Sequence, residues 1–520
     1  MNQDSTQKTS LFNRFLNLVE VVGNKLPHPI VLFALFALAT VLLSALFNSM
    51  GISATGDLVN RATGKVETQT IKAISLLNPK GLVYMMTSAV KNYTSFAPLG
   101  TVLVAMLGVG VAETSGYIPA LLKRTVAVTP HRLITPVVVF LGIMSNIASD
   151  AGYVILIPIG ALMFMAYGRH PMAGLAAAFA GVSGGFSANL LIGTLDPLLS
   201  GISTEAVHIL DVSRSVEPTS NWYFMIASTF VITIIGTLVT DYIVEPRLGV
   251  FTGNDSHKGL GSNELTSVEK NALTKANLAL LAFVGLVTAL AFPADSFLRN
   301  AKTGSLIAKA PFMESIILLI MLLFLIPAIV YGYSSKKFTD HRQVCAALGK
   351  AMSSLGPYMA LTFVAAQFIN YFGYTKLGTI IALKGAQFLE ATGLGGIPLM
   401  IMFIIFSAFI NLFMGSASAK WTILAPIFIP MFMLLGYSPE LTQVAYRIGD
   451  SCTNLITPLM SYFAMIITFA KEYDEESGIG TLISTMLPYS LCFLIGWSIL
   501  LIIWMMFNLP LGPGAYMFMK

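Results

Sequence analysis

Three charged residues, Asp196, Arg447 and Asp450, stand inside long apolar stretches of this 520-residue sequence. A charged side chain at the centre of a bilayer costs about 3 kcal/mol or more, so such residues indicate function. An arginine can bind a carboxylate through two parallel hydrogen bonds. A partly buried aspartate can carry a proton, because desolvation favours its neutral form, or it can face a cation. The three residues therefore suggest binding of an acidic solute and coupling to H+ or Na+.

Arg447 and Asp450, together with Trp421 and Lys420 at the third of the interruptions described below, also have structural interpretations. Arg447 and Asp450 are at positions i and i+3, so they could pair on one face of a helix. Trp421 could stack on an aromatic solute or simply fill the core. Lys420, beside it, could attract an anionic solute or extend its ammonium group into a polar cavity. The sequence leaves both interpretations of each residue open.

Short runs of glycine and small polar residues interrupt the apolar stretches at four places. They are "SNIASDAG" from Ser145, "VSGGFSANLLIGTLDP" from Val182, "GSASAKW" from Gly415 and "IGDSCTNLITP" from Ile448. Within a membrane, such breaks are tolerated only where they are buried in protein or line a cavity. Their free backbone groups can bind ions or polar solutes.

Five polar side chains in or near these interruptions are candidates for binding. Asn146, Asn189 and Asn454 could hold Na+ or polar solute atoms, or they could satisfy broken backbone hydrogen bonds. Asp150 and Ser418 each precede the helix that leaves an interruption, a position typical of helix N-caps. Asp150 could also bind a cation. A sodium site is therefore expected, without an assigned set of ligands.

The composition restricts the class of protein. Hydrophobic residues make up 55% of the chain and charged residues 11%, whereas soluble proteins carry about 25% charged residues. The mean hydropathy is +0.77. The net charge of +5 falls mostly in loops, which argues against nucleic-acid binding. The cysteines Cys345, Cys452 and Cys492 match no zinc or disulfide spacing, so no cofactor is expected. The sequence predicts an all-α polytopic protein of the lipid bilayer.

Nine apolar stretches are long enough to cross about 30 Å of hydrocarbon as helices. They lie near residues 30–48, 98–115, 172–200, 222–244, 275–292, 312–333, 350–372, 440–463 and 485–508. Two further apolar regions, near 133–167 and 397–435, are split in the middle and are expected to be re-entrant hairpins. Residues 1–29 are expected to hold an amphipathic helix over 13–26 and no cleavable signal.

Part of the sequence is repeated. The stretch from Tyr153 to Pro171 agrees with the stretch from Trp421 to Pro439 at nine of nineteen positions. The motif "SANLL" from Ser187 likewise resembles "CTNLI" in the second half. Residues 85–203 and 355–470 are therefore expected to share one plan: a helix, then a hairpin, then a broken helix. Residues 30–80, 204–354 and 471–520 supply the other spans and loops.

The short loops predict the orientation of the chain. Lysine and arginine in them place the N-terminus in the cytoplasm, and nine crossings then place the C-terminus outside. The two hairpins open toward opposite faces, so the units form an inverted-topology repeat. That architecture is typical of secondary transporters with a central binding site.

Longer motifs point to one family. They are "GNKLPHP", "APLGTVLV", "GRHPMAGLAAAFAGVSGGFSANLL", "DPLLSGIS", "NWYFM", "SAKWTILAPIF", "YRIGDSCTNLITPLMSYF" and "LPLGPG". With them the sequence resembles the AbgT family of p-aminobenzoyl-glutamate transporters, closest to its gonococcal type, nearly from end to end.

The resemblance implies a homodimeric protein of the bacterial inner membrane with nine spans and two hairpins. It implies ion-driven transport of p-aminobenzoyl-glutamate, which carries an aromatic amine and two carboxylates, or export of sulfonamide antimetabolites. The family's functional positions carry over onto Asp196, Ser418, Trp421, Pro439, Arg447, Asp450 and Pro458. Lys420 departs from the family's motif and leaves the substrate preference open.

Two alternatives to an exporter are weighed against the sequence. One is a transporter that only imports the folate fragment. The other is an intramembrane aspartyl protease, since two aspartates could form a catalytic pair. That class needs a Gly-x-Gly-Asp arrangement, whereas Asp450 follows "RIG" and Asp196 lies in "TLDP". We therefore expect a transporter and not an enzyme.

Overall fold

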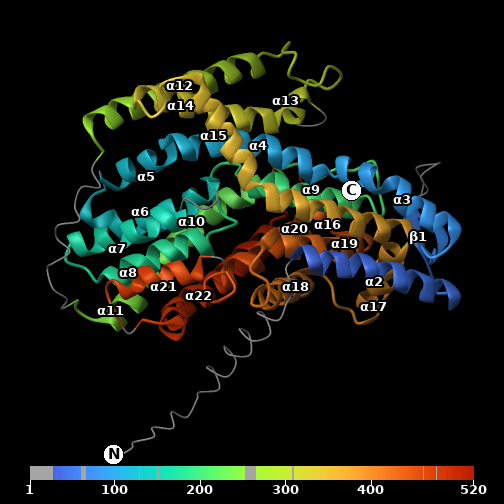
Figure 1. Ribbon diagram of the computed structural model, residues 1–520. Coiled ribbons are helices and arrows are strands. Elements are labelled where there is room, and N and C mark those ends of the chain that lie inside the picture. Colours follow the sequence, from blue (N-terminus) through green and yellow to red (C-terminus); the bar gives the residue numbers. More distant parts are fainter. Residues whose placement is uncertain are drawn as a thin grey trace, which may run out of the picture.

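The computed structural model describes residues 27, 29–59, 66–127, 129–148, 152–251, 265–306, 310–460, 462–475 and 477–519. The expected amphipathic helix over 13–26 and the candidate Asp150 lie outside these described residues. The described chain is mostly helical, and its elements are labelled in Figure 1.

Six of the expected spans are long continuous helices, built from runs of Leu, Ile, Val and Phe that keep their backbone hydrogen bonds within the segment. They are α2 (Pro29–Ser49), α4 (Ala97–Ser115), α10 (Trp222–Val239), α12 (Ser267–Ala291), α14 (Ile316–Ser334) and α22 (Ile479–Met506). The expected span near 350–372 is α16 (Gly356–Tyr374), which follows α15 (His341–Ser354) at a bend.

The number of crossings stays a prediction. Among the described residues, seven helices are long and apolar enough to span a membrane, or up to eight if one bent pair counts as a span. One of the seven is an arm of the second hairpin, and the expected spans near 172–200 and 440–463 are missing from this set because both are broken.

The first repeat unit contains the expected hairpin and broken helix. After α4 come α5 (Tyr117–Ala127), the hairpin arms α6 (Ile134–Ser145) and α7 (Ile157–Ala166), and the broken helix α8 (Pro171–Phe179) with α9 (Leu195–Val207). Short turns lie between them: η1 (His131–Leu133), η2 (Asn146–Ala148), η3 (Gly152–Leu156) and η4 (Ala180–Gly184).

The second unit has the same order of elements. After α16 come α17 (Leu377–Ala391), the hairpin arms α18 (Gly396–Asn411) and α19 (Ala417–Leu434), and the broken helix α20 (Pro439–Thr453) with α21 (Phe463–Lys471). A matching hydrogen bond occurs in both units. The Nδ2 group of Asn146 donates to the carbonyl oxygen of Gly185 at 3.5 Å, and that of Asn411 donates to the carbonyl oxygen of Asp450 at 2.6 Å. The inverted orientation of the two units remains a prediction.

Several elements were not predicted. A two-stranded antiparallel sheet, β1 (Ser53–Val59) with β2 (Val66–Lys72), corrects the expectation that this loop, like the rest of the chain, lacks strands. The other additions are helical: α3 (Pro79–Thr94), α5, α15, α17, α13 (Pro311–Glu314) and α11 (Glu245–Leu248), which the π turn η5 (Thr240–Val244) joins to α10. Apart from this sheet, the regular elements of the described residues are helical, as expected.

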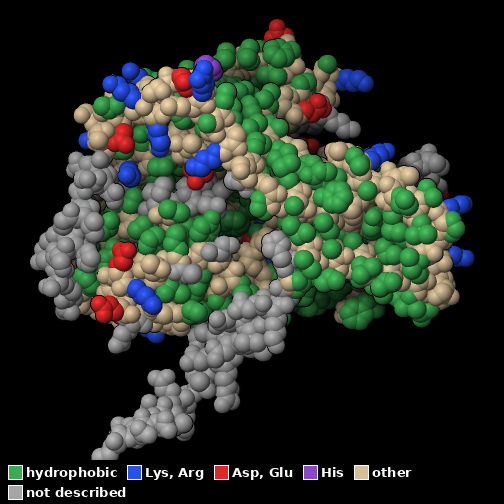
Figure 2. All heavy atoms as spheres, viewed as in Figure 1, with side chains coloured by type: hydrophobic (Ala, Val, Ile, Leu, Met, Phe, Trp, Pro, Cys, Tyr) green, Lys and Arg blue, Asp and Glu red, His purple; other side chains and the backbone are tan. Residues whose placement is uncertain are grey.

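Glycines let the hairpins pack closely on the broken helices. A Cβ on Gly181 would collide with the carbonyl oxygen of Val139, and one on Gly449 would collide with that of Ile404. The arm α6 therefore lies backbone to backbone against η4, and α18 against α20. In Figure 2, hydrophobic side chains cover much of the visible face, while the charged ones gather toward its margins, as expected for a surface in contact with lipid.

Candidate functional site

A cavity of about 710 Å³ lies where the two hairpins and the two broken helices meet. The hairpin tips contribute Asn146 in the first unit and Ser416 and Ser418 in the second, and the two helix breaks contribute Thr194 and Asn454. The four interruptions found in the sequence therefore converge on one site. Its size is that of pockets for small molecules, about 300–1,000 Å³.

The wall of the cavity is mostly apolar, with a few polar groups and an aromatic platform. Tyr153 and Tyr462 line it and stack on each other, with their ring centroids 4.6 Å apart and their planes 12° from parallel. Tyr153 belongs to the first unit and Tyr462 to the second, and the Tyr153 hydroxyl lies 3.2 Å from the Ser183 Oγ. Such a pair offers an apolar surface to an aromatic ring.

Only part of the predicted site lines this cavity. Asn146, Ser418 and Asn454 do so. The others lie behind or away from its wall: Asn189, Asp196, Trp421, Pro439, Arg447, Asp450 and Pro458. Asp150 is not among the described residues.

Arg447 pairs with Asp196 rather than with Asp450, so the ion pair suggested by the i, i+3 spacing is not formed. The Nη2 of Arg447 lies 2.7 Å from the Oδ1 of Asp196, and the side chains are 4% and 2% exposed. The Oδ2 of Asp196 accepts a hydrogen bond from the backbone N–H of Gly193 at 2.7 Å. Asp196 lies in the first turn of α9, where a negative charge is stabilised by the helix dipole. The pair joins the two repeat units.

The guanidinium of Arg447 keeps spare hydrogen-bonding capacity. Among the described residues, its Nε and Nη1 have no hydrogen-bond partner. A second, much smaller void of about 10 Å³ lies beside Arg447 and Ser187, about the size of one water molecule. In this conformation Arg447 therefore faces this void and not the large cavity.

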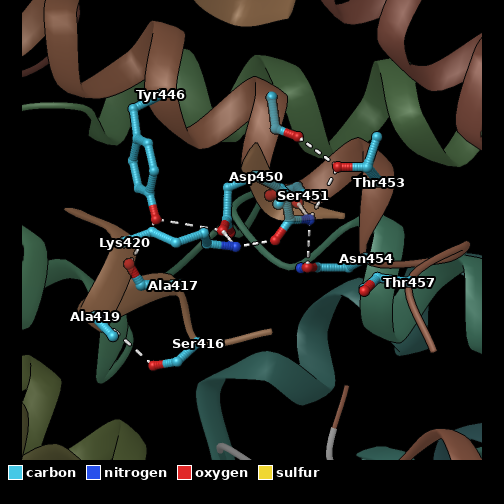
Figure 3. Close-up of polar contacts among 12 residues, drawn as sticks. Ser416, Ala417, Ala419, Lys420, Tyr446, Asp450, Ser451, Thr453, Asn454 and Thr457 are labelled. Carbon is cyan, nitrogen blue, oxygen red and sulfur yellow. Dashed lines mark hydrogen bonds and ion pairs between the residues drawn. The ribbon is translucent and has the colours of Figure 1, made fainter. Parts of the chain in front are cut away.

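Lys420 and Asp450 form a second buried ion pair, which is shown in Figure 3. The Lys420 Nζ lies 2.6 Å from the Oδ1 of Asp450, and each side chain is 1% exposed. Lys420 also donates to the Oδ1 of Asn411, whose Nδ2 donates to the Oδ1 of Asn454 at 2.8 Å. The expectation that Lys420 extends into a polar cavity or meets an anionic solute is wrong for this conformation, because its ammonium is held inside the protein.

Trp421 fills the core. Its side chain is completely buried, stacks on Tyr446 with ring centroids 4.4 Å apart, and donates from Nε1 to the Ser203 Oγ at 2.9 Å. The structural interpretation of Trp421 therefore holds here, and the face offered to an aromatic solute belongs to Tyr153 and Tyr462.

One capping assignment is wrong, and two predicted site prolines lie at helix boundaries. Ser416, and not Ser418, is the N-cap of α19, because its Oγ accepts the backbone N–H of Ala419. Ser418 lies in the first turn and lines the cavity. Pro439 occupies the first turn of α20 after the N-cap Ser438, and Pro458 lies in the break before α21.

Asn189 satisfies backbone groups, as its structural interpretation proposed. Its Oδ1 accepts from the N–H of Leu191, and its Nδ2 donates to the carbonyl oxygen of Ile143 at 3.4 Å. Asn411 was missed by the sequence analysis, although it corresponds to Asn146 at the offset of 265 that relates "SANLL" to "CTNLI". Tyr462 was also missed, and no correspondence between the repeat units pointed to it.

Among the described residues, no group of three or more His, Cys, Asp or Glu could hold a metal ion. A helical membrane protein with broken helices around a central cavity belongs to the class of membrane transporters.

The chain belongs to the AbgT transporter family, whose family model matches residues 14–519. It is 36% identical over 516 residues to the p-aminobenzoyl-glutamate transport protein of Escherichia coli, covering 99% of both chains. The crystal structure of the Alcanivorax borkumensis YdaH transporter is similar, with 45% identity, a TM-score of 0.87, and coverage of 94% of this chain and 100% of that one. MtrF of Neisseria gonorrhoeae, of a class of antimetabolite efflux pumps, matches at 50% identity and a TM-score of 0.91, over 96% and 100% of the chains.

These relatives confirm the resemblance seen in the sequence. The protein is a multi-pass membrane transporter and not an enzyme, which excludes the aspartyl protease alternative.

Proposed function

We propose that this protein is an ion-coupled secondary transporter that exports p-aminobenzoyl-glutamate and sulfonamide-type antimetabolites by alternating access. The observation that carries the proposal is the cavity between the two hairpin tips and the two helix breaks. The relatives named for p-aminobenzoyl-glutamate transport and for antimetabolite efflux support the choice of substrates.

The chemistry of the cavity suits these substrates. Both carry an aniline ring, which can lie against the stacked Tyr153 and Tyr462. The first turn of α19, with Ser416 and Ser418, forms part of the wall. The N-terminus of a helix favours negative charge, so this turn can receive a carboxylate of p-aminobenzoyl-glutamate. Arg447 would take that role only in a conformation that opens its ion pair with Asp196.

The proposal extends to the assembly and its place in the cell. The protein acts as a homodimer in the bacterial inner membrane, with its N-terminus in the cytoplasm and its C-terminus in the periplasm. Its two units are related by inverted topology. The central cavity opens alternately to the cytoplasm and to the periplasm, so that a bound solute crosses the membrane. The coupling ion is H+ or Na+.

Proteoliposomes with independently imposed proton and sodium gradients test this function. Labelled p-aminobenzoyl-glutamate and a labelled sulfonamide should move in the direction of export when one gradient is present, and should stop when it is collapsed. Accumulation only in the opposite direction would favour the import alternative. Movement that is indifferent to both gradients would contradict ion coupling.

A further inference from the structure

Building on the proposed ion-coupled transport, we infer that the ammonium group of Lys420 is a built-in cation. It occupies the oxygen-lined position beside Asp450, so that this protein neither binds Na+ there nor needs Na+ for transport. The proposed function allows either H+ or Na+ as the coupling ion. If Na+ is not needed, H+ is the ion that drives transport.

The ammonium group of Lys420 contacts two side-chain oxygen atoms. Its Nζ contacts the Oδ1 of Asp450 at 2.6 Å and the Oδ1 of Asn411. Hydroxyl and amide oxygens of Thr453 and Asn454 lie next in the network, both accepting from the Nδ2 of Asn411, at 2.9 and 2.8 Å. A carboxylate with amide and hydroxyl oxygens is the kind of ligand set that hard metal cations prefer.

A free metal cation cannot share this position with the lysine. Both partners of the pair are buried, and like charges a few ångströms apart repel strongly away from bulk water. Arg447, which lies on α20 close to Asp450, pairs with Asp196 instead. Asp450 therefore has a single charged partner among the described residues, and that partner is covalently attached to the chain.

The first repeat unit indicates that the fold does not require this pair. At the offset of 268 that aligns Trp421 with Tyr153, Lys420 corresponds to Gly152, and Asp450 corresponds to Gly185 at the offset of 265. A Cβ on Gly152 would collide with the Ser145 side chain, so the first unit has no room for even a small side chain there. Since both positions are glycines, the described parts of that hairpin and break meet without a counterpart of the Lys420–Asp450 pair.

The ion pair of Lys420 with Asp450 does not line the transport cavity but lies close to residues that do. Asn454 lines the cavity and accepts the hydrogen bond from Asn411, which in turn accepts from Lys420. Ala419, the neighbour of Lys420, also lines it. Two asparagines, Asn454 and Asn411, thus connect the cavity to the ammonium group.

Binding of radioactive sodium to the purified full-length protein tests the inference without any transport substrate. We expect the natural protein and Lys420→Arg to show no saturable sodium binding. The Lys420→Gln variant removes the built-in charge and keeps Asp450, so it should gain saturable binding. The double variant Lys420→Gln, Asp450→Asn should lose it again, and Lys471→Gln, at an exposed lysine, should behave as the natural protein.

Two results would overturn the inference. One is saturable sodium binding by the natural protein itself. The other is proteoliposome transport by the natural protein that stops when choline replaces sodium. If Lys420→Gln does not fold, these two measurements on the natural protein still decide. The proposed substrates can fail independently, since absence of p-aminobenzoyl-glutamate transport leaves the sodium-binding result unaffected.

Discussion

At the scale of residues, the ion pair of Arg447 with Asp196 joins the two repeat units at their helix breaks. The pair is nearly inaccessible to water, and loss of one partner leaves an uncompensated buried charge. Removing one partner of such a pair typically costs about 3–5 kcal/mol, whereas replacing both can be close to neutral. A single substitution of Arg447 or Asp196 should therefore destabilise the protein more than the substitution of both.

We predict that Asp196→Asn or Arg447→Gln alone lowers the free energy of unfolding by about 3 kcal/mol or more. The double variant should lose clearly less than the sum of the two. Denaturation of the purified protein measures all three. The same cycle on Arg214 and Glu440, whose side chains are 28% and 8% exposed, should give a smaller coupling. Strict additivity for Asp196 and Arg447 would contradict the pairing.

The sequence identified the chemically important residues better than it identified their partners. Asp196, Arg447 and Asp450 all lie in buried ion pairs, whereas the sequence suggested a pair only between Arg447 and Asp450. The spacing rule considered only neighbours on one helix, and it therefore joined Arg447 to Asp450. The actual partners come from α9 and α19, which only the tertiary packing brings to α20.

At the scale of elements, close packing of α18 on α20 depends on Gly449. A Cβ at this position would meet the backbone of Ile404 and the side chain of Ser407. We predict that Gly449→Ala costs about 1–3 kcal/mol of stability through overpacking, measured as a lower unfolding midpoint. Gly285→Ala, in α12 with open space around it, is the control and should be neutral or stabilising. Equal effects of the two changes would contradict the close approach.

The start of α8 provides a pH-sensitive element. The Nδ1 of His170 accepts the backbone N–H of Met172 at 3.2 Å and so caps the helix. Burial lowers the pKa of His170, opposed by the nearby carboxylates of Glu245 and Asp474. The unfolded chain therefore takes up a proton at a higher pH than the folded protein does. The contribution of His170 to stability is present above its ordinary pKa of about 6.5 and is lost as the pH falls through its lowered value.

We predict that the unfolding midpoint falls as the pH is lowered from neutral toward about 5. His170→Asn keeps a capping oxygen that does not titrate, so it should weaken this dependence. His341→Asn, at an exposed histidine, should leave it unchanged. A pH dependence that is identical in His170→Asn and the natural protein would contradict the capping role.

Pro, Gly and small polar residues predicted where the apolar stretches break, and helices end at these four interruptions. The re-entrant course of the hairpins and the repeat stay predictions. The helix α17 was not predicted because it has only 15 residues, whereas a membrane span needs roughly 20. The strands β1 and β2 were not predicted, although "VETQTIK" in β2 alternates β-branched and polar residues.

At the scale of the whole molecule, the central cavity connects the two repeat units. Tyr153 of the first unit stacks on Tyr462 of the second, and Trp421 of the second donates to Ser203 of the first. The repeated stretch that begins at Tyr153 and at Trp421 thus supplies two aromatic contacts between the units. A solute bound between the hairpins touches both units and can couple their movement.

The central claim is that substrate binds in the cavity lined by Ser418. In a variant without the three native cysteines, Ser418→Cys should react with a small thiol reagent, while Thr422→Cys, buried one turn further along α19, should react slowly. We predict that p-aminobenzoyl-glutamate slows labelling of Ser418→Cys in proportion to its occupancy of the site. A labelling rate that stays unchanged at substrate concentrations that saturate transport would contradict the account.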